Sequence, residues 1–261
     1  MNYAINSAWL PKKGNKLTEY EDALYPKESG LYNEKQTVTI AVSDGASESL
    51  LSGQWAELLV RLCCKDSSIF ENLDLFIKKA CRGWKLWLKC YLRTRERNFK
   101  PIKWFEEPGL ASGAFASLIC MKAADGNDVD KNQWEAISLG DSCLFQVRED
   151  KMIISFPVSS SSEFNNRPYL LASNPQKNSR IMMHAQKITG KWKKNDTFFL
   201  MTDALAAWFL KQVEDGETPW ISILDSETTR YEDSLKELVE SLRERGAIRN
   251  DDVSVIRLDL R

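Results

Sequence analysis

The sequence predicts an α+β fold in which helices cover stacked antiparallel sheets. Many short segments alternate apolar and polar residues, as half-buried strands do. The strand-like segments between residues 113 and 156 are joined by connections too short for a crossover helix, which favours antiparallel pairing. The predicted helices carry apolar stripes, and such a stripe needs a sheet or another helix to cover it.

Length and composition are sufficient for one large core. The chain has 261 residues, of which 43% are hydrophobic, so we expect a single domain spanning residues 1–261. The net charge of -1 provides no general attraction to nucleic acid or to an anionic membrane. No apolar run approaches the roughly 20 residues that span a bilayer, and the N-terminus lacks signal-peptide features. We therefore expect a cytoplasmic protein that binds neither nucleic acid nor membrane.

The cysteines and the histidine limit the possible chemistry. No Cys-x-x-Cys pair occurs, and the chain is long for a disulfide scaffold, so we expect reduced and mostly buried thiols. The single histidine, His184, cannot form a His-rich zinc site alone and excludes mechanisms that need two histidines. No cysteine is followed by arginine six positions later, which excludes a thiolate phosphatase loop. The cysteines are Cys63, Cys64, Cys81, Cys90, Cys120 and Cys143.

Seven segments are predicted strands, and those from 113 to 156 are expected to form one antiparallel meander. Alternation is clearest in Val38, Ile40 and Val42, which share one face. The segments are 37–43, 113–123, 134–140, 143–150, 151–156, 196–202 and 252–260.

Three long segments are predicted helices. Residues 53–64 and 69–92 each place apolar side chains at steps of three or four, and we interpret the tryptophans of the second as core residues. Residues 232–246 begin with acidic side chains and end at a glycine, as dipole and capping rules favour. The basic tail after residue 92 is interpreted as a solvated helix end, and 158–169 as a surface loop.

Carboxylates stand at the ends of several predicted strands. Asp44 ends the strand 37–43, Asp203 follows the strand 196–202, and Asp251 precedes the last strand. If the last strand runs antiparallel to the other two, these three carboxylates meet at one edge. Asp141, in a turn between two strands, and the Glu21-Asp22 pair are further candidates.

Clustered carboxylates predict a site for hard divalent cations. They repel one another and raise each other's pKa, and a divalent cation removes that cost. Oxygen ligands without His or Cys favour Mg²⁺ or Mn²⁺ over zinc. Gly45 fits such a site because its backbone carbonyl can approach an ion closely. Taken singly, Asp-Gly is an ordinary turn and an Asp before a helix is usually an N-cap; their joint occurrence beside strands favours the metal site.

The order of these motifs resembles that of the metal-dependent type 2C Ser/Thr protein phosphatases (the PPM family), and more closely that of its bacterial members. The resemblance extends from about Lys16 to Leu258. It implies a four-layer α/β/β/α sandwich of two antiparallel sheets with helices on both outer faces. The matching segments, in order, are YEDAL, VSDGASES, ASGAFASLI, SLGDSCLF, FFLMTDALAAWF and NDDVSVIRL.

By position, the resemblance implies a centre of two Mg²⁺ or Mn²⁺ ions with Asp44, Asp203 and Asp251 as the catalytic carboxylates. Asp44 would bridge both ions, and the Gly45 carbonyl would bind the first. Asp203 and Asp251 would complete the second.

The resemblance also implies a role for the remaining acidic candidates. Glu21 and Asp22 would hold metal-bound waters. Asp141 would support a third, weaker metal site shared with Asp203.

The sequence departs from the family pattern at several positions of the expected site. Ala204 replaces a glycine, and Ala207 replaces an aspartate that would serve the third metal. Asp252 stands where asparagine is usual, and Ala46 stands where many eukaryotic members carry a histidine as proton donor. The phosphate-binding arginine is missing at its usual place, where Lys16 is the nearest cation.

The implied activity is hydrolysis of phosphoserine and phosphothreonine in proteins by a metal-activated water. The expected partners are a phosphorylated protein substrate and a cognate Ser/Thr kinase, and we expect a monomer. Specificity is assigned to residues 93–110, with Trp104 and Phe105, and to the loop 158–169. The alternatives are a binding or regulatory module that keeps the fold with a weakened site, and another metal-dependent phosphotransfer enzyme such as a nuclease, which the absence of a basic groove pattern disfavours.

Overall fold

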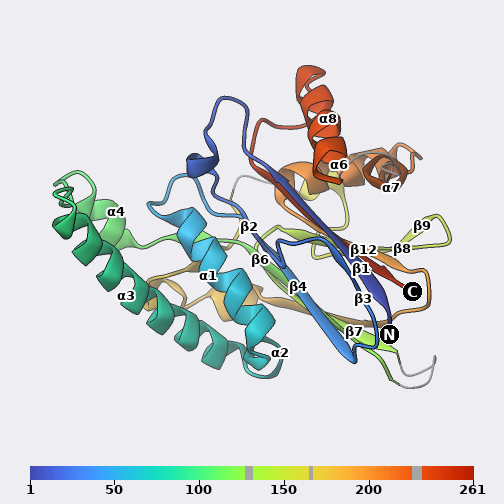
Figure 1. Cartoon of the computed structure of the whole chain (residues 1–261), viewed down its shortest axis with the longest axis horizontal. Coiled ribbons are helices and arrows are strands. Elements are labelled where there is room, and N and C mark those ends of the chain that lie inside the picture. Colours follow the sequence, from blue (N-terminus) through green and yellow to red (C-terminus); the bar gives the residue numbers. More distant parts are fainter. Residues whose placement is uncertain (127–131, 165–166, 225–230) are drawn as a thin grey trace.

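Two stacked sheets with helices on their outer faces make up the protein in the computed structural model (Figure 1). The structure describes residues 1–126, 132–164, 167–224 and 231–261. Every strand pairing in it is antiparallel. The four-layer arrangement implied by the resemblance is therefore confirmed.

The first sheet is built around the two ends of the chain. The C-terminal strand pairs on one side with the N-terminal strand and on the other with the strand that precedes Asp203. In spatial order its strands are β3 (Gly30–Tyr32), β1 (Tyr3–Leu10), β13 (Val253–Leu260), β12 (Thr197–Met201), β8 (Cys143–Arg148) and β9 (Lys151–Phe156).

The second sheet contains the strand that precedes Asp44 near one edge. In spatial order its strands are β11 (Gln186–Lys191), β7 (Gln133–Leu139), β6 (Leu118–Ala124), β4 (Thr37–Ser43) and β2 (Ala23–Tyr25). A separate two-stranded ribbon joins β5 (Phe115–Ala116) to β10 (Leu171–Ala172).

The helices form the two outer layers (Figure 1). Those that share a hydrophobic cluster with the second sheet are α1 (Ser52–Lys65), α2 (Ser68–Glu71), α3 (Leu73–Arg97) and α5 (Ile181–His184). The short helix α4 (Glu107–Ser112) has no buried residue. Those packed on the first sheet are α6 (Asp203–Glu214), α7 (Pro219–Leu224) and α8 (Tyr231–Glu244). Short 3-10 turns are η1 (Leu17–Glu19), η3 (Ser161–Glu163) and η4 (Pro175–Lys177). Within the described ranges, no helix combines the length and the apolar character needed to cross a bilayer.

The apolar residues form three clusters, one between the sheets and one under each helical layer. Val38, Ile40 and Val42 face the inter-sheet cluster, as their alternation predicts. Ala41 faces the opposite way and packs under α1. Because β4 is covered on both faces, its backbone direction is held firmly up to Asp44.

The predicted meander over residues 113–156 is wrong. The segment forms two hairpins in different sheets, β6–β7 in the second and β8–β9 in the first. The chain changes sheets at Gly140, whose φ of +104° and close approach to Ser117 exclude a side chain. Both hairpins have the same period-two pattern, so the pattern could not show which sheet each one joins.

The sequence analysis did not predict several features of the fold. The strand β1 pairs with β13 along its whole length, but its centre carries polar residues. One of them, Ser7, is buried and donates its hydroxyl to the carbonyl of Pro26. The predicted helix over 69–92 is divided at Asn72, whose side chain caps α3 by accepting a hydrogen bond from the backbone of Leu75. The residue range 158–169 contains η3, and its residues 165–166 lie outside the described part of the chain.

A large-to-small substitution between the sheets tests this core. Phe198 is fully buried and packs edge-on against Trp134 at 5.5 Å between ring centroids. We expect Phe198→Ala to lower the free energy of unfolding by about 3–5 kcal/mol, because it leaves a cavity. Phe99, whose side chain is 93% exposed, is the matched control, and Phe99→Ala should change stability by less than about 0.5 kcal/mol. Urea denaturation of both variants measures the difference, and equal effects would contradict the assigned core.

Candidate metal centre

Carboxylates from both sheets meet at one end of the sandwich. Asp44 follows β4 of the second sheet, whereas Asp203 and Asp251 flank the adjacent strands β12 and β13 of the first. The last strand is antiparallel to β12 as supposed, but β4 lies in the opposite sheet, so the cluster spans the sandwich. Burial raises the pKa of Asp44 well above its usual value, and the neighbouring charges of Asp22, Asp203, Asp141 and Asp251 raise it further.

Two serines hold the turns that carry Asp44 and Asp141. The backbone N–H of Asp44 donates to Ser117 Oγ at 3.1 Å, and the N–H of Ser117 donates to the Asp44 carbonyl at 2.8 Å. Ser117 Oγ also lies 2.6 Å from Ser142 Oγ, next to Asp141. The buried hydroxyl pair therefore couples the two turns across the sheets. Sequence reasoning missed both serines, because nothing in a single sequence pairs residues 25 positions apart.

Gly45 is required by packing alone. A Cβ atom there would lie 2.5 Å from the carbonyl oxygen of Glu21 and 2.8 Å from the carbonyl carbon of Ser52. The Asp-Gly pair therefore allows the Asp44 turn, the Glu21-Asp22 segment and the first turn of α1 to pack against each other.

Two carboxylate oxygens at the centre have no hydrogen-bond partner although they are buried. They are Asp22 Oδ2 and Asp203 Oδ1. Burial raises the pKa of Asp22 well above its usual value, and the charge of Asp252 adds to the effect. An unpaired buried acceptor is costly, and a cation satisfies it. The donor set of aspartate oxygens without nitrogen or sulfur suits Mg²⁺ or Mn²⁺.

Asp141 belongs to the same cluster. Burial, followed by the charge of Asp203, raises its pKa to about 7, while the charge of Arg249 acts in the opposite direction. Ala207 lies one helical turn beyond Asp203 in α6 and offers no ligand oxygen. The third, weaker metal site therefore rests on Asp141 and Asp203 alone and stays a prediction.

The aspartates do not form a compact ligand set for one ion. In the described part of the chain, the only three metal-ligating side chains with donor atoms all within 4.8 Å of one another are cysteines.

Arg249 is a member of the cluster that the sequence analysis did not identify. Its guanidinium forms an ion pair with Asp203 and lies 3.9 Å from Asp251 Oδ2. The arginine supplies a positive charge among the carboxylates and lowers the pKa of Asp203, which burial raises. The only sequence signal was its position two residues before Asp251.

Glu21 and Asp252 act on the loop beside the cluster. The Glu21 carboxylate accepts a hydrogen bond from Ser52 Oγ at 2.7 Å and lies 3.6 Å from Lys12 Nζ. Asp252 accepts the backbone N–H groups of Lys12 and Glu21, each at 2.7 Å. The carboxylate at position 252 thus anchors the N-terminal loop to β13, which accounts for the departure from asparagine. The structure also brings Lys12, rather than Lys16, next to Glu21.

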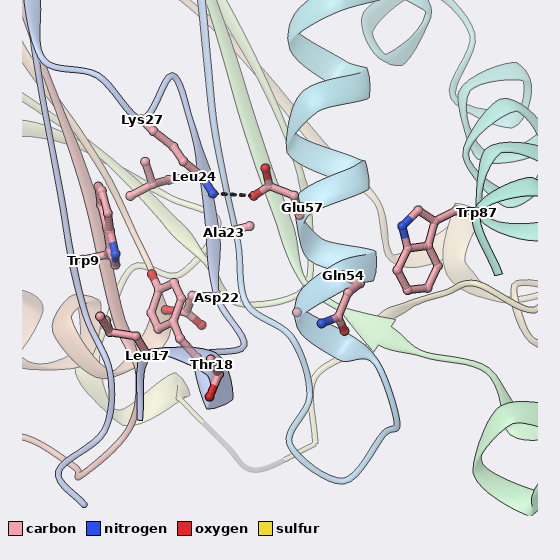
Figure 2. A pocket seen from close by; sticks show the side chains of 12 residues that line it. Trp9, Leu17, Thr18, Asp22, Ala23, Leu24, Lys27, Gln54, Glu57 and Trp87 are labelled. Carbon is pink, nitrogen blue, oxygen red and sulfur yellow. Dashed lines mark ion pairs between the residues drawn. The ribbon is translucent and has the colours of Figure 1, made fainter. Parts of the chain in front are cut away.

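A pocket of about 560 Å³ adjoins the cluster between β2 and α1, with Asp22 on its wall. Figure 2 shows Lys27 and Glu57 facing each other across it, and their ion pair measures 3.0 Å. Trp9 and Leu17 line the side opposite α1 (Figure 2). The buried Asp22 can therefore be approached from this pocket as well as from the cluster.

A family model described as "Protein phosphatase 2C" matches residues 21–252. The chain belongs to the protein phosphatase 2C family. The sequence matches no curated protein. All the carboxylate candidates and the cysteines at positions 63, 64 and 120 lie within the matched range.

Solved structures show the same fold at low sequence identity. The S. agalactiae serine/threonine phosphatase has a TM-score of 0.59 at 12% identity, covering 98% of this chain and 100% of that one. The Mycobacterium tuberculosis phosphatase PstP/Ppp has a TM-score of 0.58 at 15% identity, covering 100% and 99%. The PstP catalytic domain in complex with 2 manganese ions has a TM-score of 0.55 at 12% identity, covering 98% of each chain.

The raised pKa values predict how the stability of the metal-free protein depends on pH. The folded protein binds more protons than the unfolded chain between the ordinary Asp pKa of about 3.9 and the raised values, so stability falls as pH rises. For Asp141 the loss should extend through about pH 7. Urea midpoints of chelated protein between about pH 5 and 8 measure it. Asp141→Asn should flatten the dependence of the urea midpoint on pH, and Mn²⁺ should restore stability at the upper end of this pH range. A urea midpoint that rises with pH would contradict the cluster.

Arg249 should compete with cations for Asp203 and Asp251. We expect Arg249→Gln to tighten Mn²⁺ binding roughly fivefold, because a partly exposed ion pair no longer has to be broken. Isothermal titration calorimetry at moderate salt measures the change. Arg245→Gln, an exposed arginine on the same segment, is the control and should leave Mn²⁺ affinity unchanged. Weaker Mn²⁺ binding in Arg249→Gln would show that the arginine supports the ligands instead.

Proposed function

We propose that the protein is a metal-dependent phosphomonoester hydrolase that removes phosphate from phosphoserine and phosphothreonine in proteins. The observation that carries the proposal is the cluster of Asp22, Asp44, Asp141, Asp203 and Asp251, in which burial and neighbouring charges raise the pKa values of Asp22, Asp44 and Asp141. Two of its oxygens are buried without partners, which is the environment that divalent cations satisfy. Family membership supports a phosphatase over other uses of such a cluster.

The residues that would hold the ions are those already assigned from the resemblance. Asp44, the Gly45 carbonyl, Asp203 and Asp251 would hold the ions. Glu21 and Asp22 would hold metal-bound waters, and Asp141 would support a third ion. When bound, Mg²⁺ or Mn²⁺ ions supply a water activated near neutral pH and offset charge on the phosphoryl oxygens.

The chain's own residues keep this arrangement in place and limit the proton transfers. The Ser117–Ser142 contact fixes the Asp44 and Asp141 turns before any substrate arrives, so little reorganisation is required. Ala46 has no proton to donate, so the leaving group must be protonated by another donor. Lys12, whose ammonium donates to Ser47 Oγ at 3.1 Å beside the Asp44 loop, and Arg249 are the cations proposed to bind the phosphate.

The proposed partners, location and oligomeric state are those expected from the sequence. The partners would be a phosphorylated protein substrate and a cognate Ser/Thr kinase, with the phosphatase acting as a cytoplasmic monomer that binds neither nucleic acid nor membrane. Two observations favour the alternative of a weakened or inactive regulatory module. Ala207 removes a ligand of the third site, and Arg249 already pairs with two of the proposed ligands.

Phosphate release from phosphoserine and phosphothreonine peptides tests the proposal. We expect Mn²⁺ or Mg²⁺ to support hydrolysis and chelator to abolish it. Asp44→Asn should lower kcat by roughly a hundredfold or more, because it removes a charge that acts in the transition state. Asp215→Asn, at an exposed aspartate paired with Lys211 after α6, should retain full activity.

Two further measurements separate the alternatives. Mn²⁺ binding without peptide hydrolysis would support the regulatory module instead of the enzyme. Cleavage of single- or double-stranded nucleic acid in the same buffer would support the nuclease. Absence of both metal binding and phosphate release would refute the proposed centre.

A further inference from the structure

Three cysteines form a cluster beneath helix α1, away from the carboxylates. Cys63 and Cys64 lie in the last turn of α1, and Cys120 lies on β6 of the sheet below. Their three sulfur atoms are all within 4.8 Å of one another. Ser52, which packs against Gly45 beside the aspartates, begins the same helix at its opposite end.

The cluster is enclosed by apolar side chains and has one partly accessible member. Cys63 and Cys120 are 2% and 0% exposed and belong to the cluster of core residues under α1. Cys64 is half-buried, in contrast to the two buried members. The other three cysteines serve as internal references, because Cys81 and Cys143 are buried outside the cluster and Cys90 is exposed.

The thiols interact with one another rather than with polar core groups alone. Burial raises the pKa values of Cys63 and Cys120 well above the usual thiol value. Burial opposes ionisation of Cys64 too, but hydrogen bonds from Cys120 and Cys63 lower its pKa to about 5. The three thiols thus influence one another's ionisation, while the Cys63 and Cys64 thiols donate to the carbonyls of Val60 and Tyr25 in the metal-free protein. A thiolate is the form of cysteine that binds metal ions.

We propose that Cys63, Cys64 and Cys120 form a binding site for one thiophilic d¹⁰ cation, Zn²⁺ or Cu⁺. Three thiolates at about 2.3 Å from a zinc ion stand about 3.8 Å apart, so sulfur atoms within 4.8 Å need to move by only about 1 Å. The carbonyl oxygen of Tyr25, 3.9 Å from Cys64 Sγ, offers a fourth donor at the end of β2.

Charge and ligand softness decide which ions fit. Three thiolates leave a net charge of about -1 with Zn²⁺ and about -2 with Cu⁺, and the smaller charge costs less to bury. Cu⁺ accepts three sulfur ligands without a fourth donor and therefore remains the second ion of the class. Mg²⁺ and Mn²⁺ prefer oxygen, so the thiol site and the aspartate centre would select different cations in one chain.

A bound ion would join three elements that the carboxylate centre depends on. It would link α1 to β6 and, through the Tyr25 carbonyl, to β2. Ser52 begins α1, Ser117 directly precedes β6, and Asp22 directly precedes β2. The bound ion would therefore cross-link these three elements. This proposal does not rest on the phosphatase activity, because its ligands and its test are separate from the aspartates.

Titration of the reduced full-length protein with Cd²⁺ tests the site, since cadmium stands in for zinc and its thiolate bonds absorb in the ultraviolet. We expect a thiolate-to-metal charge-transfer band that saturates at about one equivalent per chain, as for other d¹⁰ thiolate sites. Prior loading with Zn²⁺ should raise the Cd²⁺ concentration needed for saturation, because the two ions compete for the same thiolates. A parallel titration with Cu⁺ under anaerobic conditions separates the two native candidates. Mn²⁺ should leave the band unchanged, and the band should persist in Asp44→Asn, which separates this site from the carboxylate centre.

Matched cysteine variants identify the ligands. Cys64→Ser and Cys120→Ala should each abolish saturation at one equivalent, whereas Cys143→Ala, a buried thiol outside the cluster, and Cys90→Ser should retain it. Protection from alkylation provides a second measurement on the unaltered protein. Zn²⁺ should slow iodoacetamide labelling of Cys64 by roughly tenfold or more and leave Cys90 unaffected, because a bound sulfur is no longer a free nucleophile.

The proposal is overturned by any of three results. The unaltered protein could show no charge-transfer band with Cd²⁺ and no zinc protection of Cys64. The band could persist in both cluster variants. It could also disappear equally in Cys143→Ala, which would show that the signal depends on core packing and not on these three ligands.

Discussion

Mutual repulsion among the aspartates is the constraint around which this protein is arranged. Strands of two sheets deliver Asp44, Asp203 and Asp251 to the same end of the sandwich, where the charges of Asp203 and Asp251 raise the pKa of Asp44. Such a cluster is stabilised by protonation or by positive charge supplied from a neighbouring group or ion. Arg249 supplies part of it within the chain, and the unpaired oxygens of Asp22 and Asp203 leave room for more.

The scaffold meets this constraint with close backbone contacts. Gly45 and Gly140 stand where a Cβ atom would overlap neighbouring residues, and Ser117 contacts both turns that carry carboxylates. Asp252 ties the N-terminal loop to β13 through two backbone N–H groups. The long helix α1 begins at this centre and ends at the three thiols, so its seating on the sheet connects the two proposed metal sites.

The departures from the family pattern acquire physical explanations only from these contacts. Asp252 is an anchor for Lys12 and Glu21, and its extra charge is matched by two donors. Ala207 removes an oxygen ligand without disturbing α6, since alanine favours the helix. Lys12 donates to Ser47 beside Asp44, whereas the backbone N–H of Lys16 donates to the Glu19 carboxylate at the start of η1.

The sequence by itself determined the helix and strand types with strong periodicity, and it placed acidic residues at strand ends. Those features are local, because periodicity and capping depend on neighbours along the chain. Tertiary structure alone decided that β7 and β8 lie in different sheets, that β1 pairs with β13, and that Ser117, Ser142 and Arg249 join the aspartates. It also brought Cys120 to Cys63 and Cys64. These pairings join residues far apart in the chain, and no local pattern records a contact that only the packed fold creates.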